Sequence, residues 1–162
     1  MNRYLAAAAL AATTTLAAPA LAQAMTPQDY VAAAGASDLY ERQSSELVHA
    51  STSNPKVRDF ARMMIDHHTK STTDVEAAAT AAGLKPSPPK LMPAQAEMIA
   101  HLKTQNGPAR DAAYLSQQKL AHEQALKLHR TYAKEGTAKP LKTAASGIVP
   151  VVERHIAMLK TM

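Results

Sequence analysis

The chain has 162 residues with 18 Lys and Arg against 13 Asp and Glu, a net charge of +5, and no Cys. The basic residues are scattered among acidic ones, and aromatic residues are scarce, so the composition argues against a nucleic-acid-binding surface. Without Cys, the sequence excludes disulfide bonds and a lipid anchor on an N-terminal Cys. The length fits one domain with one core.

The N-terminus has the pattern of a cleavable export signal. Arg3 precedes an apolar, Ala-rich stretch that ends in small residues suited to signal peptidase, with cleavage after Ala22 or Ala24. A run of Thr and a Pro interrupt the stretch, which is too short to span roughly 30 Å of hydrocarbon. Preferring Ala24, we expect residues 1–24 to be a signal peptide. Residues 25–162 would then form one mature domain without a transmembrane segment, in the periplasm or secreted.

Proline and glycine mark the ends of five predicted helices, because Pro is accepted in a first helical turn and Gly ends a helix. In chain order the ranges are Pro27 to about Ser53, Pro55 to about Ala82, Pro93 to about Gln105, Pro108 to about Lys134, and Pro140 to the C-terminus. Pro150 is expected to kink the last helix. Four long helices and one short helix, each with an apolar stripe, predict an all-α four-helix bundle.

One histidine stands out in the last predicted helix. His155 lies at the centre of that helix's apolar stripe, four residues after Val151 and four before Leu159. Its side chain is therefore expected to point into the bundle. A lone His in such a place is more often a neutral core residue with one hydrogen-bond partner. Its interpretation depends on which polar groups join it.

Polar residues on the other helices are expected to meet this histidine. Glu41 is in line with Ala34, Ser45 and Val48, and a buried Glu requires a cation or a proton. The four long helices would each supply one group to the interior: Glu41, either His67 or His68, His122, and His155. Such a mixture of imidazole and carboxylate suits a zinc, iron or copper ion.

Asp66 has two interpretations. It lies between Arg62 and Lys70 at four-residue spacing, as in an ordinary solvated charge stripe. Alternatively, its carboxylate orients a metal-binding His on a neighbouring helix. His49 and His101 are taken as surface residues.

Two other kinds of metal site fit the sequence less well. A di-iron oxidase needs two Glu-x-x-His pairs, and the chain has only Glu46 with His49, turned away from Glu41. A Cu(I) site would use thioethers, although Met more often fills gaps in a core. The Met residues next to the candidate histidines are Met63, Met64, Met158 and Met162.

Three motifs carry a family resemblance. The segment 54–70, NPKVRDFARMMIDHHTK, follows Glu41; Asp111-Ala112-Ala113-Tyr114 precedes His122; and Pro150 lies five residues before His155. Together they resemble the bacterial domain of unknown function 4142 family over essentially the whole mature chain.

The resemblance implies a ferritin-like bundle with one extra short helix, export to the cell envelope, and the description of an outer-membrane protein. It implies no defined activity. The family pattern maps onto Glu41, Asp66, His67, His122 and His155, and so favours His67 over His68. Arg110 stands where the family usually has Phe, which affects local packing.

The combined interpretation is an exported bundle that binds a transition metal through Glu41, His67, His122 and His155, in envelope metal handling or stress tolerance. Two alternatives stay open. The buried polar groups could bond only one another and fix the packing of a structural or interaction protein. A redox or hydrolytic metalloenzyme would need an open coordination position and a cleft, neither of which the sequence shows. The sequence indicates no catalytic residue and identifies no protein partner.

Overall fold

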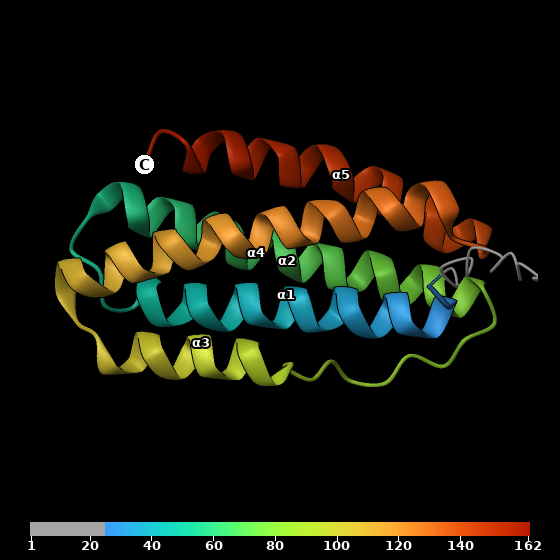
Figure 1. Ribbon diagram of the computed structural model, residues 1–162, viewed down its shortest axis with the longest axis horizontal. Helices are drawn as coiled ribbons and strands as arrows, with labels where there is room; N and C mark the ends of the chain where they lie inside the picture. Colours follow the sequence, from blue (N-terminus) through green and yellow to red (C-terminus); the bar gives the residue numbers. More distant parts are fainter. Residues whose placement is uncertain (1–24) are drawn as a thin grey trace, which may run out of the picture.

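The computed structural model describes residues 25–162, so the predicted signal peptide lies outside the described residues. The described chain contains five helices and no strand, which confirms the all-α class (Figure 1). They are α1 (Pro27–His49), α2 (Pro55–Ala81), α3 (Pro93–Thr104), α4 (Gly107–Glu135) and α5 (Lys139–Leu159). Within residues 25–162, no helix is both long and apolar enough to cross a membrane.

The helices begin where the Pro residues in the sequence predict. Every helix has Pro in its first turn, and side chains cap α1 and α2: Thr26 accepts from the Asp29 N–H and Asn54 from the Lys56 N–H. α1 ends four residues earlier than Ser53, the predicted end. The Thr52 N–H makes the last bond of helical type, to the Val48 carbonyl oxygen, whereas the Asn54 N–H donates to the Thr52 hydroxyl at 3.0 Å, and so the chain turns here. The same hydroxyl donates to Asp111 Oδ2 at 2.7 Å, which fixes the turn against α4.

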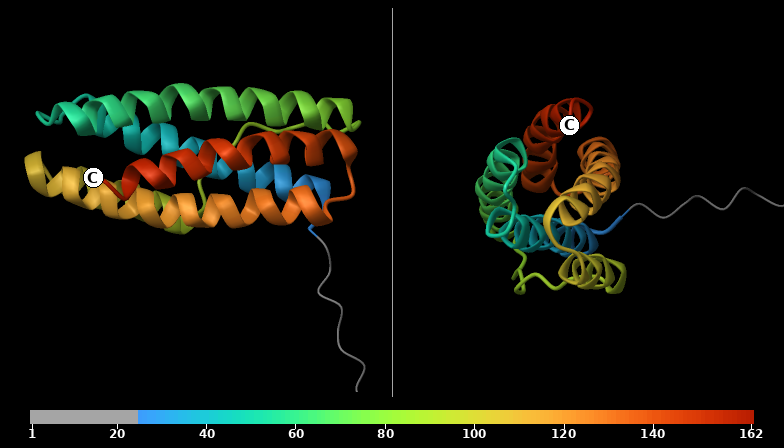
Figure 2. Two further views of the ribbon diagram at one scale, coloured as in Figure 1. Left: turned by 90° about the horizontal axis from the view of Figure 1, so that it is seen from above. Right: turned by 90° about the vertical axis from the view of Figure 1, so that its left-hand side faces the viewer.

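The four long helices form a bundle with one long crossover connection. In Figure 1, α1 and α5 run in one direction and α2 and α4 in the other. Residues 82–106, which include α3, return along the outside of α1, so that each helix is antiparallel to both of its bundle neighbours (Figure 2). A single long crossover of this kind is the ferritin-like topology. The predicted ferritin-like bundle with one extra short helix is confirmed. α5 continues through Pro150, which is exposed.

The core consists of two large apolar clusters separated by a polar layer, and a small third cluster of Tyr40, Ile99 and Ala121 lies between α1, α3 and α4. The first cluster comprises Tyr30, Ala34, Val75, Ala79, Ala125, Tyr132, Leu141, Ala145, Ile148 and Val152. The second comprises Val48, Val57, Phe60, Ala61, Met64, Leu102, Tyr114 and Leu159. Between them along the chain, each long helix has a buried polar residue: Glu41 in α1, His68 in α2, His122 in α4 and His155 in α5. We call these four residues the polar layer.

A separate polar pair lies inside the first apolar cluster. Nδ1 of His129, which is 2 % exposed, lies 2.9 Å from the Tyr30 hydroxyl, and the Tyr30 ring stacks on Tyr132 with centroids 3.9 Å apart. Burial lowers the pKa of His129 from 6.5 to about 4. The folded protein therefore holds this imidazole neutral over a range in which an unfolded chain would protonate it.

Two glycines in the helical region are expected to respond oppositely to Ala. A Cβ at Gly136 would lie 2.6 Å from the Tyr132 carbonyl oxygen, whereas a Cβ at Gly147, in the interior of α5, meets nothing within 4 Å. Gly136→Ala should lower the free energy of unfolding by about 1–3 kcal/mol through overpacking. Gly147→Ala should raise it by about 0.5–1 kcal/mol through helix propensity. Urea denaturation measures both, and effects of equal sign would contradict this packing.

The His129 pKa predicts an acid-dependent loss of stability. As the pH falls from about 6.5 to about 4, the unfolded chain binds a proton that the folded state does not, so the free energy of unfolding decreases. For this residue alone the decrease is at most about 3 kcal/mol. The measurement is urea denaturation of wild type and His129→Gln across this range. The difference between the two should shrink with decreasing pH, and a constant difference would show that His129 titrates normally.

Candidate metal centre

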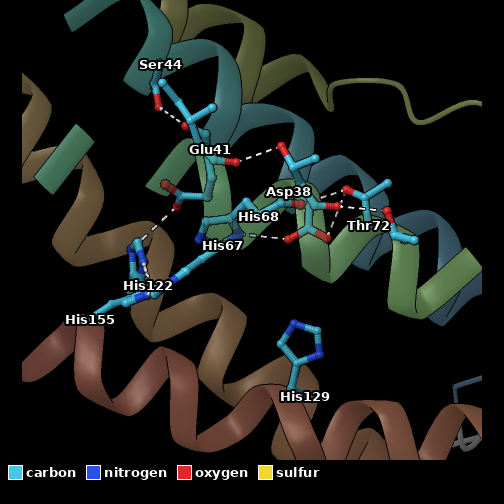
Figure 3. A network of polar contacts seen from close by, with 12 residues as sticks. Asp38, Glu41, Ser44, His67, His68, Thr72, His122, His129 and His155 are labelled. Carbon is cyan, nitrogen blue, oxygen red and sulfur yellow. Dashed lines mark hydrogen bonds and ion pairs between the residues drawn. The ribbon is translucent and has the colours of Figure 1, made fainter. Parts of the chain in front are cut away.

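Three histidines from three helices converge in the polar layer. His68, His122 and His155 each offer one ring nitrogen, and these nitrogens lie within 4.8 Å of one another. The ring centroids are 5.2 to 5.7 Å apart, and all three side chains are buried. Figure 3 shows them grouped beside Glu41, with His129 apart from the group. Imidazoles this close can reach a single ion.

The fourth long helix adds a buried carboxylate. Glu41 is fully buried, and its Oε1 lies 3.5 Å from Nδ1 of His122. Neither carboxylate oxygen has a hydrogen-bond partner among residues 25–162. Removing a carboxylate from water without compensation is costly. The position therefore calls for a cation or a proton.

His68 is held by a second carboxylate. Its Nδ1 donates to Asp38 Oδ1 at 2.8 Å, and the other Asp38 oxygen accepts from Thr72 at 3.3 Å. Burial lowers the pKa of His68, but the hydrogen bond to Asp38 and the charges of Glu41 and Asp38 outweigh it and raise the pKa overall. With Nδ1 engaged, Nε2 is the free ring nitrogen, and it too has no partner in the described part of the chain. A carboxylate that orients a histidine in this way is common beside metal ions.

The remaining histidines form a directed chain of hydrogen bonds. Nδ1 of His122 lies 2.9 Å from the Gln118 carbonyl oxygen and must be the donor, so its Nε2 accepts from Nδ1 of His155 at 3.1 Å. Nε2 of His155 then accepts from Nδ1 of His67 at 2.8 Å. Burial lowers the pKa of His122, and burial together with the neighbouring histidines lowers that of His155 to about 2. Both are held as neutral imidazoles, the form that binds metals.

Most of the residues expected from the sequence meet in the polar layer. Glu41, His122 and His155 lie there, whereas His67 is exposed and reaches the layer only through its bond to His155. The helix α2 instead places His68 in the three-histidine cluster. The buried positions of α2 recur three or four residues apart, and His68 continues this stripe four residues after Met64. Periodicity left the two histidines open, and the family resemblance had favoured His67.

Asp66 lies on the surface. Its side chain is 63 % exposed and lies 3.5 Å from Arg62 Nε, as the charge-stripe interpretation expects. The carboxylate that orients a histidine is Asp38, which sequence reasoning missed. The sequence does contain a feature that points to Asp38: it lies three residues before Glu41, and this spacing places both acids on one face of α1.

The methionines near the candidate histidines, and also His49 and His101, lie outside the layer. Met64 belongs to the second apolar cluster, against which Met63 and Met158 also pack, so these thioethers fill the core. His101 is exposed as expected, and His49 is half-buried at the end of α1.

Comparisons with known proteins agree with this fold. A crystal structure from Streptomyces coelicolor, described as the "putative secreted protein DUF305", superposes with a TM-score of 0.65 at 17 % sequence identity. The match covers 85 % of this chain and 90 % of that chain, so the two share their helical fold. A search of the curated proteins gave no match. None of these comparisons supports the description of an outer-membrane protein.

The family model for a domain of unknown function, DUF4142, matches residues 10–162. This match covers nearly the whole sequence, including the motifs around Glu41, His122 and His155. The chain therefore belongs to the DUF4142 family.

Proposed function

We propose that this protein binds one divalent transition-metal ion, zinc, iron or copper, in the polar layer. The ligands would be imidazole nitrogens of His68, His122 and His155 and the carboxylate of Glu41. Three imidazoles and one carboxylate, without thiolate, suit these ions and could fill a tetrahedral zinc site.

The observation that carries the proposal is that buried polar atoms of the layer lack hydrogen-bond partners. Both Glu41 oxygens and Nε2 of His68 are buried without a partner within residues 25–162. A purely structural network is stable only when each buried member is satisfied, because each orphan group costs about 1–3 kcal/mol. A cation bound between Glu41 and the histidines would compensate all three atoms at once.

The proposed setting is the cell envelope, where the protein would take part in metal handling or stress tolerance. This rests on the export pattern of residues 1–24 and on the structural relative, which is described as secreted. The polar layer does not require a catalytic role, because its four groups can complete the coordination of an ion by themselves.

The first experiment measures metal-dependent stability of the exported protein after removal of metals with a chelator. We expect Zn²⁺, Cu²⁺ or Fe²⁺ to raise the melting temperature. At a free concentration of 100 times Kd the stabilisation should be about 2.7 kcal/mol. His68→Ala and His155→Ala should lose this response, and the exposed control His101→Ala should keep it. If no metal shifts the wild-type melt and none is retained on purification, the proposal fails.

Substitution of the buried acid separates a metal site from a structural network. Glu41→Gln removes a buried charge that lacks hydrogen bonds, so the metal-free variant should be at least as stable as wild type. Its metal affinity should nevertheless fall strongly, because a charged ligand is lost. Calorimetric titration and thermal melts test the two effects. A less stable metal-free variant would instead favour the structural network.

A matched pair of acids tests the orientation of His68. Asp38→Asn removes the carboxylate that accepts from His68 Nδ1 and should weaken metal binding by about 10- to 100-fold. Asp66→Asn changes an exposed carboxylate two positions before His68 and should leave affinity unchanged. Equal effects of the two substitutions would contradict the role assigned to Asp38.

A further inference from the structure

A groove connects the surface with the polar layer. It has a volume of about 580 Å³ and lies between α2 and α5. Its lining includes the exposed residues His67, Gly147 and Arg154 and the buried residues His68 and His155. Two other cavities, at the Pro-rich connection and at the turn between α4 and α5, are lined by no residue of the layer. The groove is therefore a path by which an ion could reach the histidines.

An exposed imidazole lies where this path meets the layer. Nδ1 of His67 donates to Nε2 of His155 at 2.8 Å, and the two rings are nearly parallel, 13° apart, with centroids separated by 5.1 Å. In this arrangement the Nε2 lone pair of His67 is not used by any described hydrogen bond. His67 thus combines access to solvent with direct contact to a buried histidine.

One position on the α5 wall of the groove carries no side chain. Gly147 is exposed in the interior of α5, where Gly costs about 0.5–1 kcal/mol relative to Ala. No neighbour lies within 4 Å of where its Cβ would be, so packing does not require Gly there. A larger side chain at position 147 would therefore project into the groove.

From this geometry we propose that the groove is the entry route for the metal ion and that His67 is its first, transient ligand. The inference rests on the proposed metal site. The His67 imidazole replaces one water on the incoming ion, and exchange with the adjacent His155 then passes the ion inward and releases His67. The ion keeps its charge throughout, and each exchange forms one metal–nitrogen bond while one metal–ligand bond breaks.

Two variants test the route by kinetics. Metal association and dissociation are followed by stopped-flow mixing of the metal-free exported protein with Zn²⁺ and a chromophoric chelator. His67→Ala and Gly147→Leu should each slow association and dissociation by about tenfold or more while Kd stays within about threefold of wild type. The controls are His101→Ala and Ala157→Leu, which alter exposed positions outside the groove. Circular dichroism confirms that each variant folds.

Each outcome of these experiments either supports or overturns the entry route and the relay through His67. Slow exchange with unchanged Kd in both groove variants and normal rates in both controls supports the route and the relay. If His67→Ala weakens equilibrium binding, His67 is a permanent ligand and the relay is overturned. Unchanged rates in either groove variant also overturn the inference, although the metal site survives if wild type still binds. Absence of wild-type binding at equilibrium would instead refute the proposed function itself.

Discussion

Burial of charge and imidazole in one layer of the bundle is the constraint on which the rest of the structure depends. Each of the four long helices supplies one polar residue at the height where the two apolar clusters meet. Sliding a single helix by one turn would move its polar group into an apolar cluster, where it would lose its partners at a cost of several kcal/mol. The layer therefore fixes the register of the helices, which apolar packing of Ala, Val and Leu alone would specify less strictly.

The crossover topology makes this layer continuous. At the level of the layer, a polar contact bridges each pair of neighbouring helices around the bundle: His68 to Asp38 between α2 and α1, His122 to Glu41 between α4 and α1, His155 to His122 between α5 and α4, and His67 to His155 between α2 and α5. With a short connection from α2 to the next long helix, the order of helices would change and the pairs would differ. The long segment that contains α3 is what allows α2 to lie beside α5.

Much of this was accessible from the sequence, for identifiable reasons. Pro and Gly act locally, so the helix ends were predicted to within one residue except at the ends of α1 and α5. α1 ends early at the turn around Thr52, and α5 ends at Leu159, three residues before the predicted C-terminal end. Periodicity placed Glu41 and His155 inward because each is surrounded by apolar residues at helical spacing. Periodicity could not decide whether His67 or His68 is buried. Adjacent residues are 100° apart around the helix axis, so these two lie on either side of the apolar stripe, and a small rotation of α2 determines which of them points inward. Asp38 depends on a partner from another helix, which periodicity does not show.

The hydrogen bonds of the layer also set the protonation pattern that a metal site requires. His68, His122 and His155 each use Nδ1 as a donor, to Asp38, to the Gln118 carbonyl and to His122 respectively. Each ring in its neutral form therefore carries its hydrogen on Nδ1 and keeps the Nε2 lone pair, and at His68, whose raised pKa favours a proton on Nε2, a bound ion would displace that proton. In the neutral form of His68 that lone pair is free; in His122 and His155 it only accepts from another imidazole. Such histidine–histidine bonds are modest in net strength, so an ion can replace them without first removing a proton from His122. The same donors that order the helices leave the nitrogen atoms ready for a cation.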